Sequence, residues 1–270
     1  MTSIPNSSPR SGLARALSKR GYCSRTAAAA LIVAGRVTLD GRVSRNPEAP
    51  TTAQSRIAVD GVELGGAASV YVMLNKPRGL VTTVSDEQGR DTVYRCLREA
   101  GLPWLAPVGR LDKASEGLLL LSNDTAWAAG ITDPAHGLTK TYHLQVSPVP
   151  DLATLAAMQA GVRLPDGEQL GALRLALLRR GERNAWVEAT LDEGRNRHLR
   201  RLCEAFDLKV LRLVRVAVGP LVLGDLAKGA WRLLREEEVA ALRGKARPSA
   251  SRTGQSAGNS ARKCSDGSAR

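Results

Sequence analysis

The sequence is poor in aromatic residues, poor in cysteine and free of long apolar runs. Aromatic side chains make up 3% of its 270 residues, and Phe occurs once. The four cysteines, Cys23, Cys96, Cys203 and Cys264, are far apart, with no CxxC pair and no His at ligand spacing. This argues against a disulfide framework and against a zinc site, and it favours free thiols. No apolar run approaches the roughly 20 residues of a membrane-spanning helix, and the N-terminus lacks the apolar core of a signal peptide, so a cytoplasmic protein is expected.

Acidic residues are also in the minority. The chain has 39 Lys and Arg against 26 Asp and Glu, which gives a formal net charge of +13. A balance of this sign indicates a nucleic acid partner first, with an acidic membrane surface as the competing interpretation. The apolar fraction of 43% supports a real core, and the length allows one large or two ordinary domains.

Composition divides the chain into five parts. Residues 1–11 and 244–270 are rich in Ser, Gly, Pro and Arg with few large apolar side chains, which predicts two disordered tails. The basic C-terminal tail either adds phosphate attraction or serves solubility. The small residues GGAAS begin a predicted linker at 65–68. We therefore expect one domain at 12–64 and a second at 69–243.

The first domain reads as a small α+β module. Its pattern predicts short helices over 13–20 and 25–34, the second capped by Ser24. Apolar pairs flank Asp40-Gly41 and Asp60-Gly61, which are signals for two-residue hairpins. Basic residues on or beside the helices and first hairpin are the predicted RNA contacts of this module: Arg15, Lys19, Arg20, Arg25, Arg36 and Arg42.

In the second domain, the stretch GRLDKASEGLLLL at 109–121 places Asp112 in a charged loop just before four leucines. A short apolar run between turn residues is typical of a strand buried on both faces. Asp112 then lies at the mouth of a rigid strand, where functional groups are often held. The alternative is a solvated turn in which Asp112 pairs with Arg110 or Lys113.

Two further segments could meet that loop. The stretch TKTYHLQV at 139–146 predicts a strand that carries Tyr142. After another strand at 186–191, the spacing of Leu199, Leu202, Cys203 and Phe206 predicts a helix with one apolar face. Arg200 lies at the border of that face, whereas Arg197 and Arg201 point to the opposite side.

A half-buried Arg200 needs a carboxylate partner, because an unpaired buried charge costs several kcal/mol. Asp112 is one such partner, and the pairing would keep it ionised. We therefore hypothesise that the loop, the strand and the helix form one cleft.

The pattern LARALSKRGYCSRTAAAALIVAGRVTLDGRVS resembles the S4 RNA-binding domain, except that Thr26 and a run of alanines replace its usual Arg and acid. The motifs NKPRGLVTT, GRLDKASEGLLLLSND, KTYHLQV, EGRNRHLRRL and LRLVRVAVGPLVLGDLAKGAWRLL are similar, in order and spacing, to bacterial pseudouridine synthases of the RsuA and RluB type. The chain departs from that family at His198, where Gln is usual, and at Thr125, where Gly is usual.

This resemblance implies an α+β catalytic domain with a mixed, largely antiparallel sheet flanked by helices. It also implies that Asp112 is the catalytic aspartate, that Tyr142 packs against the target base and that Arg200 holds the aspartate. The expected activity is conversion of uridine to pseudouridine in ribosomal RNA, by a monomer, with the large subunit favoured. Small-subunit RNA and a non-catalytic ribosome-associated protein are the alternatives. Predicted RNA contacts in this domain are Lys76, Arg110, Lys140, Arg195, Arg197 and Arg201.

Other chemistries fit the residues less well. The isomerisation involves no redox change and one carboxylate suffices, so no metal or cofactor is predicted. A glycoside hydrolase could pair Asp112 with Glu116, but a basic chain with few aromatic rings argues against sugar binding, and Glu116 is better interpreted as bracing the loop. A serine nucleophile at Ser115 or Ser122 lacks the GxSxG elbow, and no glycine cluster forms a phosphate loop.

Overall fold

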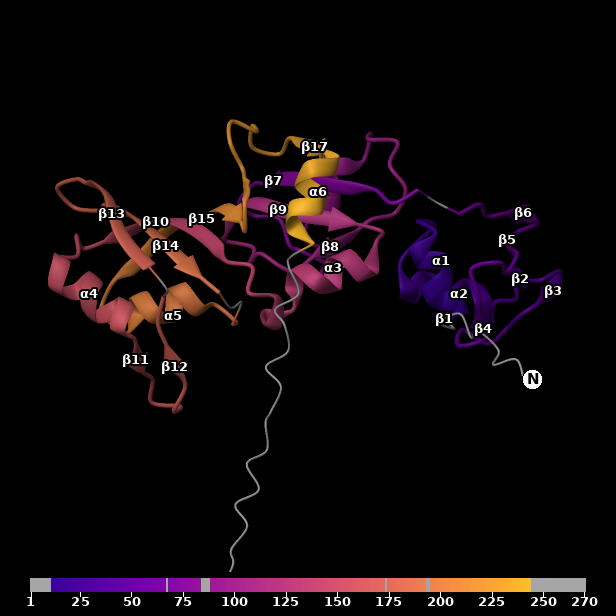
Figure 1. Cartoon of the computed structure of the whole chain (residues 1–270), viewed down its shortest axis with the longest axis horizontal. Coiled ribbons are helices and arrows are strands. Elements are labelled where there is room, and N and C mark those ends of the chain that lie inside the picture. The colour runs from indigo at the N-terminus through magenta and orange to yellow at the C-terminus, as the bar shows by residue number, and fades with distance from the viewer. Residues whose placement is uncertain (1–10, 67, 84–87, 173, 193–194, 244–270) are drawn as a thin grey trace, which may run out of the picture.

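The computed structural model describes residues 11–66, 68–83, 88–172, 174–192 and 195–243 (Figure 1). Both predicted disordered tails lie outside these ranges except for Ser11, which pairs with Thr51 in a short ladder. Ala67 of the predicted linker and Gly194 also lie outside them. Among the described residues, the helices are too short or too polar to cross a membrane.

The N-terminal module, residues 11–64, contains two helices, α1 (Leu13–Lys19) and α2 (Arg25–Val33). The Ser24 hydroxyl accepts a hydrogen bond from the Ala27 N–H at 3.1 Å, which confirms the predicted cap. The strands are β1 (Ser11–Gly12), β2 (Val37–Leu39), β3 (Arg42–Val43), β4 (Pro50–Thr51), β5 (Ile57–Val59) and β6 (Val62–Glu63). The last two and the β2–β3 pair form one sheet in the order β3-β2-β5-β6.

Both predicted hairpins of this module are present. Asp40 and Asp60 have φ of 50°, and the glycines that follow them have φ of 83° and 82°. Two consecutive residues with positive φ are what a tight type I′ turn requires. The helices and sheet bury their own hydrophobic cluster, which includes Leu17, Ile32 and Ile57. This cluster is separate from those of the rest of the chain, and Figure 1 shows the module at one end of the long axis.

The larger part of the chain is built on one twisted sheet in the order β13-β14-β10-β15-β9-β7-β17, with β16 beside β15 and β8 beside β9. All pairs are antiparallel except β15 with β9, so the predicted mixed, largely antiparallel sheet is confirmed. The strands are β7 (Tyr71–Lys76), β8 (Ala106–Val108), β9 (Glu116–Ser122), β10 (Lys140–Ser147), β13 (Arg174–Arg180), β14 (Ala185–Leu191), β15 (Lys209–Val218), β16 (Leu221–Val222) and β17 (Trp231–Leu233).

Four α-helices, two short 3-10 helices and one separate hairpin complete this part. They are α3 (Thr125–Thr132), α4 (Leu152–Ala160), α5 (His198–Glu204), α6 (Glu236–Leu242), η1 (Val93–Leu97), η2 (Pro134–His136) and the pair β11 (Val162–Arg163) and β12 (Gln169–Leu170). Figure 1 shows α4 and α5 beside the β13-β14-β10 end of the sheet, and α3 and α6 beside the β9-β7-β17 end.

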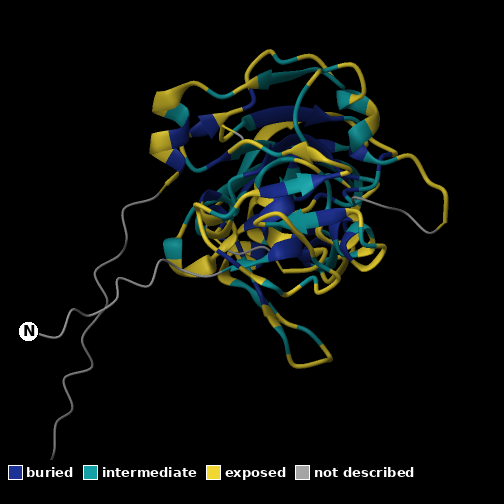
Figure 2. Cartoon of the chain, turned by 90° about the vertical axis from the view of Figure 1, so that its right-hand side faces the viewer, coloured by how far each residue is buried: buried dark blue, intermediate teal, exposed yellow. Residues whose placement is uncertain are grey.

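Strand β9 is buried along its whole length, as its leucine run predicts. Leu118 and Leu120 belong to the cluster under α3 and α6, whereas Leu119 and Leu121 belong to the cluster on the opposite face. Alternate side chains of a strand point to opposite faces, so leucine at every position means two apolar faces. Figure 2 shows such buried strands inside, with exposed residues on the loops.

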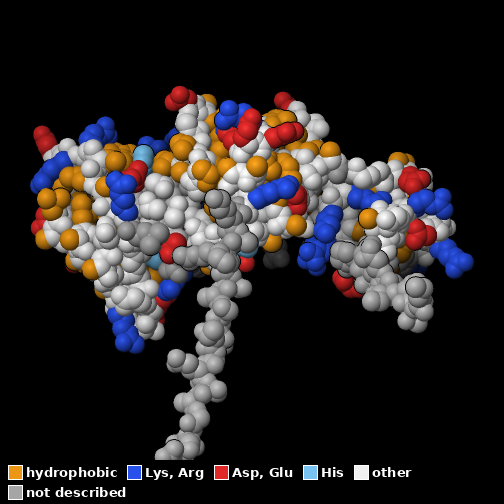
Figure 3. All heavy atoms as spheres, viewed as in Figure 1, with side chains coloured by type: hydrophobic (Ala, Val, Ile, Leu, Met, Phe, Trp, Pro, Cys, Tyr) orange, Lys and Arg blue, Asp and Glu red, His pale blue; other side chains and the backbone are white. Residues whose placement is uncertain are grey.

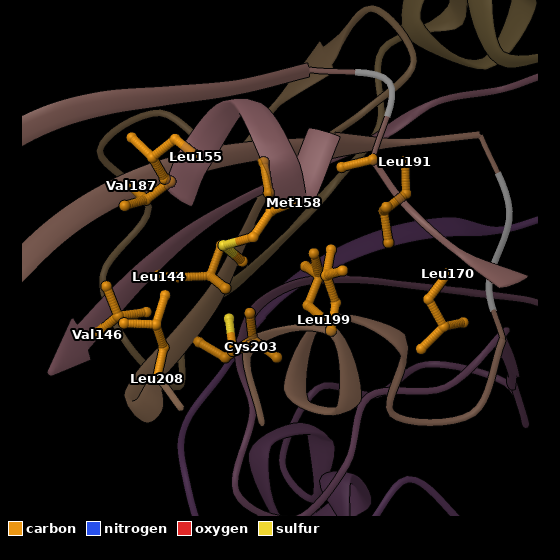
Figure 4. Packing of buried hydrophobic residues seen from close by; sticks show 14 of the residues in the cluster. Leu144, Val146, Leu155, Met158, Leu170, Val187, Leu191, Leu199, Cys203 and Leu208 are labelled. Atoms are coloured by element: carbon orange, nitrogen blue, oxygen red, sulfur yellow. The ribbon is translucent and has the colours of Figure 1, made fainter. Parts of the chain in front are cut away.

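At the other end of the sheet, α4 and α5 cover only one face. Leu144, Val187, Leu199 and Cys203 pack together in that layer (Figure 4). The predicted apolar stripe of α5 is confirmed for Leu199, Leu202 and Cys203, which are buried. Phe206 lies just beyond the end of the helix and is half-buried. The layer fixes the orientation of α5 above β10 and β14.

Candidate active-site cleft

A cleft of about 320 Å³ lies where the 109–115 loop, β10, β15 and the start of α5 converge. Its lining includes Asp112, Tyr142, Arg197, Leu199 and Arg215. The structure therefore brings Asp112 and Tyr142, from segments expected to meet, into one cavity beside α5. The hypothesis of a shared cleft is confirmed for these two side chains.

The Asp112 loop is held mainly through its backbone. The Asp112 carbonyl accepts hydrogen bonds from the Ser115 N–H at 3.0 Å and from the Lys76 ammonium at 3.1 Å. The Lys113 carbonyl accepts from the Gly79 N–H at 2.8 Å. The Asp112 carboxylate is left half-buried at the cleft wall. A backbone fixed in this way presents the carboxylate in a defined position.

Lys76 is the buried centre of that support. Its side chain is 0% exposed, and its ammonium donates to the carbonyls of Pro77 (3.2 Å), Asp112 (3.1 Å) and Ser115 (2.7 Å). Burial lowers its pKa from an ordinary 10.5 to about 8, although the negative charges of Asp112 and Glu116 act in the opposite direction. All three of its donors are used inside the protein, so Lys76 supports the loop in this structure, and its predicted contact with RNA is not tested.

Tyr142 lies in the middle of β10, between two neighbouring strands. Its backbone is paired with Ala189 of β14 and with Arg215 of β15. The ring packs against two hydrophobic clusters, the one under α4 and α5 and the one that contains Leu111. It is half-buried and lines the cleft, so one part of the ring is available to a ligand.

Arg200 reaches the Asp112 loop from α5. Its guanidinium donates to the Ala114 carbonyl at 3.3 Å, two residues after Asp112. Burial, followed by the positive charge of Arg197, lowers the pKa of Arg200, and the negative charge of Asp112 raises it. Within the described ranges, Arg200 thus contacts the loop backbone and experiences the Asp112 charge, and its hydrogen bond is to Ala114 and not to the Asp112 carboxylate. A direct pair between Arg200 and that carboxylate stays a prediction.

The other predicted RNA contacts of this domain fall into three groups. Arg110 and Arg197 are exposed at the edge of the cleft. Lys140 donates to the Leu138 carbonyl at 2.6 Å, and its pKa is lowered by burial and by the nearby Arg215. Arg195 and Arg201 form ion pairs with acidic residues of the β11–β12 hairpin.

The ion pairs of Arg201 have the shortest distances in this group. Its two terminal nitrogens lie 2.5 Å from Glu168 and 2.8 Å from Asp166. Arg201 is thus paired with two carboxylates in this structure, and its contact with RNA stays a prediction. His198 is also buried, at 4% exposure, and its Nε2 lies 2.6 Å from the Gly171 carbonyl.

Four of the six basic residues predicted to bind RNA in the N-terminal module are exposed and form no ion pair with the described part of the chain: Arg15, Lys19, Arg25 and Arg42. Arg36 is exposed but hydrogen-bonds Asp60, with Nε 2.9 Å from the carboxylate. Arg20 instead donates to the carbonyls of Leu64 (2.8 Å) and Ser55 (2.5 Å), which ties α1 to the end of the module. In Figure 3, Lys and Arg side chains are prominent over this module.

Glu116 stands at the start of β9 and does not line the cleft. It is 2% exposed and forms ion pairs with Arg212 at 3.0 Å and Lys228 at 2.5 Å. Burial alone would raise its pKa, but these two cations lower it below the ordinary value. Glu116 therefore pairs with Arg212 of β15 and with Lys228, whereas the expectation was that it braces the loop, and it forms no carboxylate pair with Asp112 in the described structure. The described residues contain no group of three potential metal ligands among His, Cys, Asp and Glu.

Arg215 lines the cleft and was not singled out from the sequence. It is 7% exposed, and its Nε donates to the Leu118 carbonyl at 2.7 Å. The signal for it is present in LRLVRVAV, where two arginines interrupt an apolar strand. Their odd spacing places Arg212 and Arg215 on opposite faces of β15, one toward Glu116 and one toward the cleft.

Comparisons with known proteins agree with this geometry. The model of the RNA pseudouridylate synthase family matches residues 70–205, and that of the S4 domain matches residues 12–57. A Bacillus subtilis protein named ribosomal large subunit pseudouridine synthase B is 33% identical, over 86% of this chain and 95% of its own. An uncharacterized RNA pseudouridine synthase from Aquifex aeolicus is 37% identical, over 84% and 91%. A crystal structure of a pseudouridylate synthase matches with a TM-score of 0.60 at 27% identity, over 87% of this chain and 100% of that one.

Proposed function

The chain belongs to the RNA pseudouridylate synthase family, and we propose that its substrate is the ribosomal RNA of the large subunit. The enzyme isomerises uridine to pseudouridine, and RNA is its partner. The choice of the large subunit rests on the named Bacillus subtilis relative, which aligns over nearly its full length. Small-subunit RNA and a non-catalytic binding role are not favoured.

Asp112 is proposed as the catalytic aspartate. The observation that supports this role is that Asp112 and Tyr142 line the same cleft. Isomerisation requires that the bond between uracil N1 and ribose C1′ breaks and that C5 joins C1′. A carboxylate can serve as the nucleophile at C1′ or stabilise positive charge there, with no cofactor. The negative charge is essential to either role.

Tyr142 and Arg200 are proposed to support this step in different ways. A uridine in structured RNA must leave its stack, and an aromatic ring is a suitable surface to receive the flipped base. The half-buried ring of Tyr142 fits that role. Arg200 acts as a positioning residue, because it holds the Ala114 carbonyl of the Asp112 loop and contributes positive charge near the carboxylate.

We propose that the N-terminal module, with limits at 12–64 and a linker at 65–68, contributes affinity for structured RNA. Its exposed Arg15, Lys19, Arg25 and Arg42 supply positive charge without base recognition. A monomer and a cytoplasmic location are proposed together with this ribosomal RNA substrate.

The test replaces the carboxylate charge alone. In Asp112→Asn, we expect pseudouridine formation to fall at least about 10³-fold, the scale on which loss of an essential catalytic group acts. RNA binding should persist, because the basic surfaces are unchanged. Asp225→Asn, on an exposed loop, is the control for loss of one negative charge. Mapping pseudouridine in ribosomal RNA from cells with and without the protein identifies the target. Full activity of Asp112→Asn would show that the aspartate is only a turn residue.

A further inference from the structure

Arg215 is a buried cation for which the described residues provide no carboxylate within ion-pair distance. Within the described part of the chain, only its Nε donates a hydrogen bond, to the Leu118 carbonyl at 2.7 Å. Its two terminal nitrogens have no acceptor among the described residues, although the residue is 7% exposed and lines the cleft. Burial of an unpaired charge is costly, and functional clefts are where such a cost is retained. The free N–H groups are available to a ligand in the cleft.

The position of Arg215 is set by the sheet. Its backbone is the register partner of Tyr142, so the two side chains lie next to each other on the same face. On the other side, β9 approaches closely at Gly117, where a Cβ atom would lie 2.2 Å from the Arg215 carbonyl oxygen. Gly117 has φ of 99°, a conformation that favours glycine. Arg215 is therefore held in a fixed place beside the Tyr142 ring.

A second cation, Lys140, adds positive charge beside Tyr142 and favours a ligand with negatively polarised atoms there. Lys140 lies two residues before Tyr142 on β10 and therefore faces the same side of the sheet. Its pKa is lowered by burial and by the charge of Arg215, with Asp192 acting in the opposite direction. The floor of the cleft thus combines an aromatic ring with guanidinium N–H donors, which suits a planar base with carbonyl oxygens on its edge.

Building on the proposed function, we propose that Arg215 donates hydrogen bonds to a carbonyl oxygen of the target uracil and stabilises the negative charge of the detached base. When the N1–C1′ bond breaks, its electron pair stays on the uracil and is shared among N1, O2 and O4. The Asp112 carboxylate meanwhile bonds to, or stabilises, C1′. The uracil then turns, its C5 attacks C1′, the carboxylate is released, and the C5 proton is lost while N1 gains one. No other reactant is consumed.

A uracil carbonyl fits Arg215 better than a phosphate does. Arg215 is buried in the cleft beside Tyr142, whereas Arg110 and Arg197 are exposed and accessible to the phosphates of a bound RNA. A donor that is already in place before charge develops acts with little reorganisation. Removing one such donor typically lowers kcat by about 10²–10³-fold.

The experiment measures single-turnover pseudouridine formation by the full-length protein on a ribosomal RNA fragment containing the target uridine. For Arg215→Met we expect a rate reduced by about 10²-fold or more. The RNA dissociation constant should change by less than about threefold, because one counterion of many is affected. Arg215→Lys should recover part of the rate. Arg179→Met, on the exposed edge strand β13, is the control for loss of one positive charge.

Substrates with sulfur in place of one uracil oxygen separate direct contact from a structural effect. Sulfur is a weaker acceptor, so 2-thiouridine or 4-thiouridine RNA should react more slowly with the wild type. If Arg215 contacts that oxygen, the penalty should shrink in Arg215→Met. Equal penalties in both proteins at both positions, or a full rate in Arg215→Met, would overturn the proposal. An active wild type with an inert Asp112→Asn would leave the proposed function standing in that case.

Discussion

Lys76→Met tests whether the catalytic loop depends on an ammonium that never reaches the surface. Methionine has a similar length and shape, so it fills the site without a large cavity. It removes the donor shared by the carbonyls of Pro77, Asp112 and Ser115. A buried acceptor left without a donor costs about 1–3 kcal/mol. With three such acceptors, some of which relax or gain water, we expect a loss of about 3 kcal/mol in the free energy of unfolding at pH 7.

The stability difference between the wild type and Lys76→Met should also depend on pH. Burial lowers the pKa of Lys76 from an ordinary 10.5 to about 8, so between these values the unfolded chain holds a proton that the folded chain has released. The folded state is then favoured as the pH rises. Each pKa unit corresponds to about 1.4 kcal/mol, so the wild type should gain up to about 3 kcal/mol over Lys76→Met between pH 8 and pH 10.5. Below pH 8 the difference should be constant.

Urea unfolding of both proteins at pH 7, 8.5 and 10 measures this difference directly. Lys113→Met is the matched control, because Lys113 is exposed on the same loop. Displacement of Asp112 by about 1 Å should also lower kcat by about 10²-fold. A stability difference that stays flat or falls above pH 8 would refute the proposed burial of a charged amine. Unchanged stability and activity of Lys76→Met would refute its role in holding the loop.

Two other perturbations follow from the same structure. Gly117→Ala should destabilise the fold by several kcal/mol more than Gly79→Ala in urea unfolding, because both glycines have φ of 99° but only the first would place a Cβ 2.2 Å from a backbone oxygen. Equal losses of unfolding free energy in the two variants would show that the positive φ, and not the close contact, causes the destabilisation. Deletion of residues 1–64 should weaken RNA binding and reduce the slope of log affinity against log salt by about 3, the change expected when Arg15, Lys19, Arg25 and Arg42 each contact one phosphate. An unchanged slope would exclude the module from phosphate contact.

Local sequence signals predicted the secondary structure well. The Asp-Gly turns, the Ser24 cap and the leucine run of β9 each depend on residues that are neighbours in the chain. The apolar stripe of α5 identified the face that packs on the sheet. Its end was less well predicted, because Phe206 continues the spacing but follows the last helical residue. A side-chain pattern continues through a helix end when the residues beyond it still pack on the same core.

Residues with long side chains were harder to interpret. Lys76, Arg20 and Arg201 are basic residues of the kind that bind RNA. In the structure they donate to carbonyls or carboxylates within the protein. Apart from Pro77, which follows Lys76 directly, their partners lie 33 to 44 positions away along the chain. Periodicity cannot reveal such pairs, because the choice between solvent, RNA and a distant carbonyl is made only when the sheet assembles. The basic residues of the sequence therefore predicted a positively charged protein, but they did not predict which group each side chain contacts.

The position of Asp112 shows why a catalytic motif alone does not define a site. Its backbone is held by Lys76 from β7 and, through Ala114, by Arg200 from α5. Both supports are cations, so they place positive charge near the carboxylate while they fix the loop. Since Lys76 and Arg200 hold the loop from two different elements, a change at either should displace the Asp112 carboxylate, and a change at the exposed Lys113 should leave the loop in place.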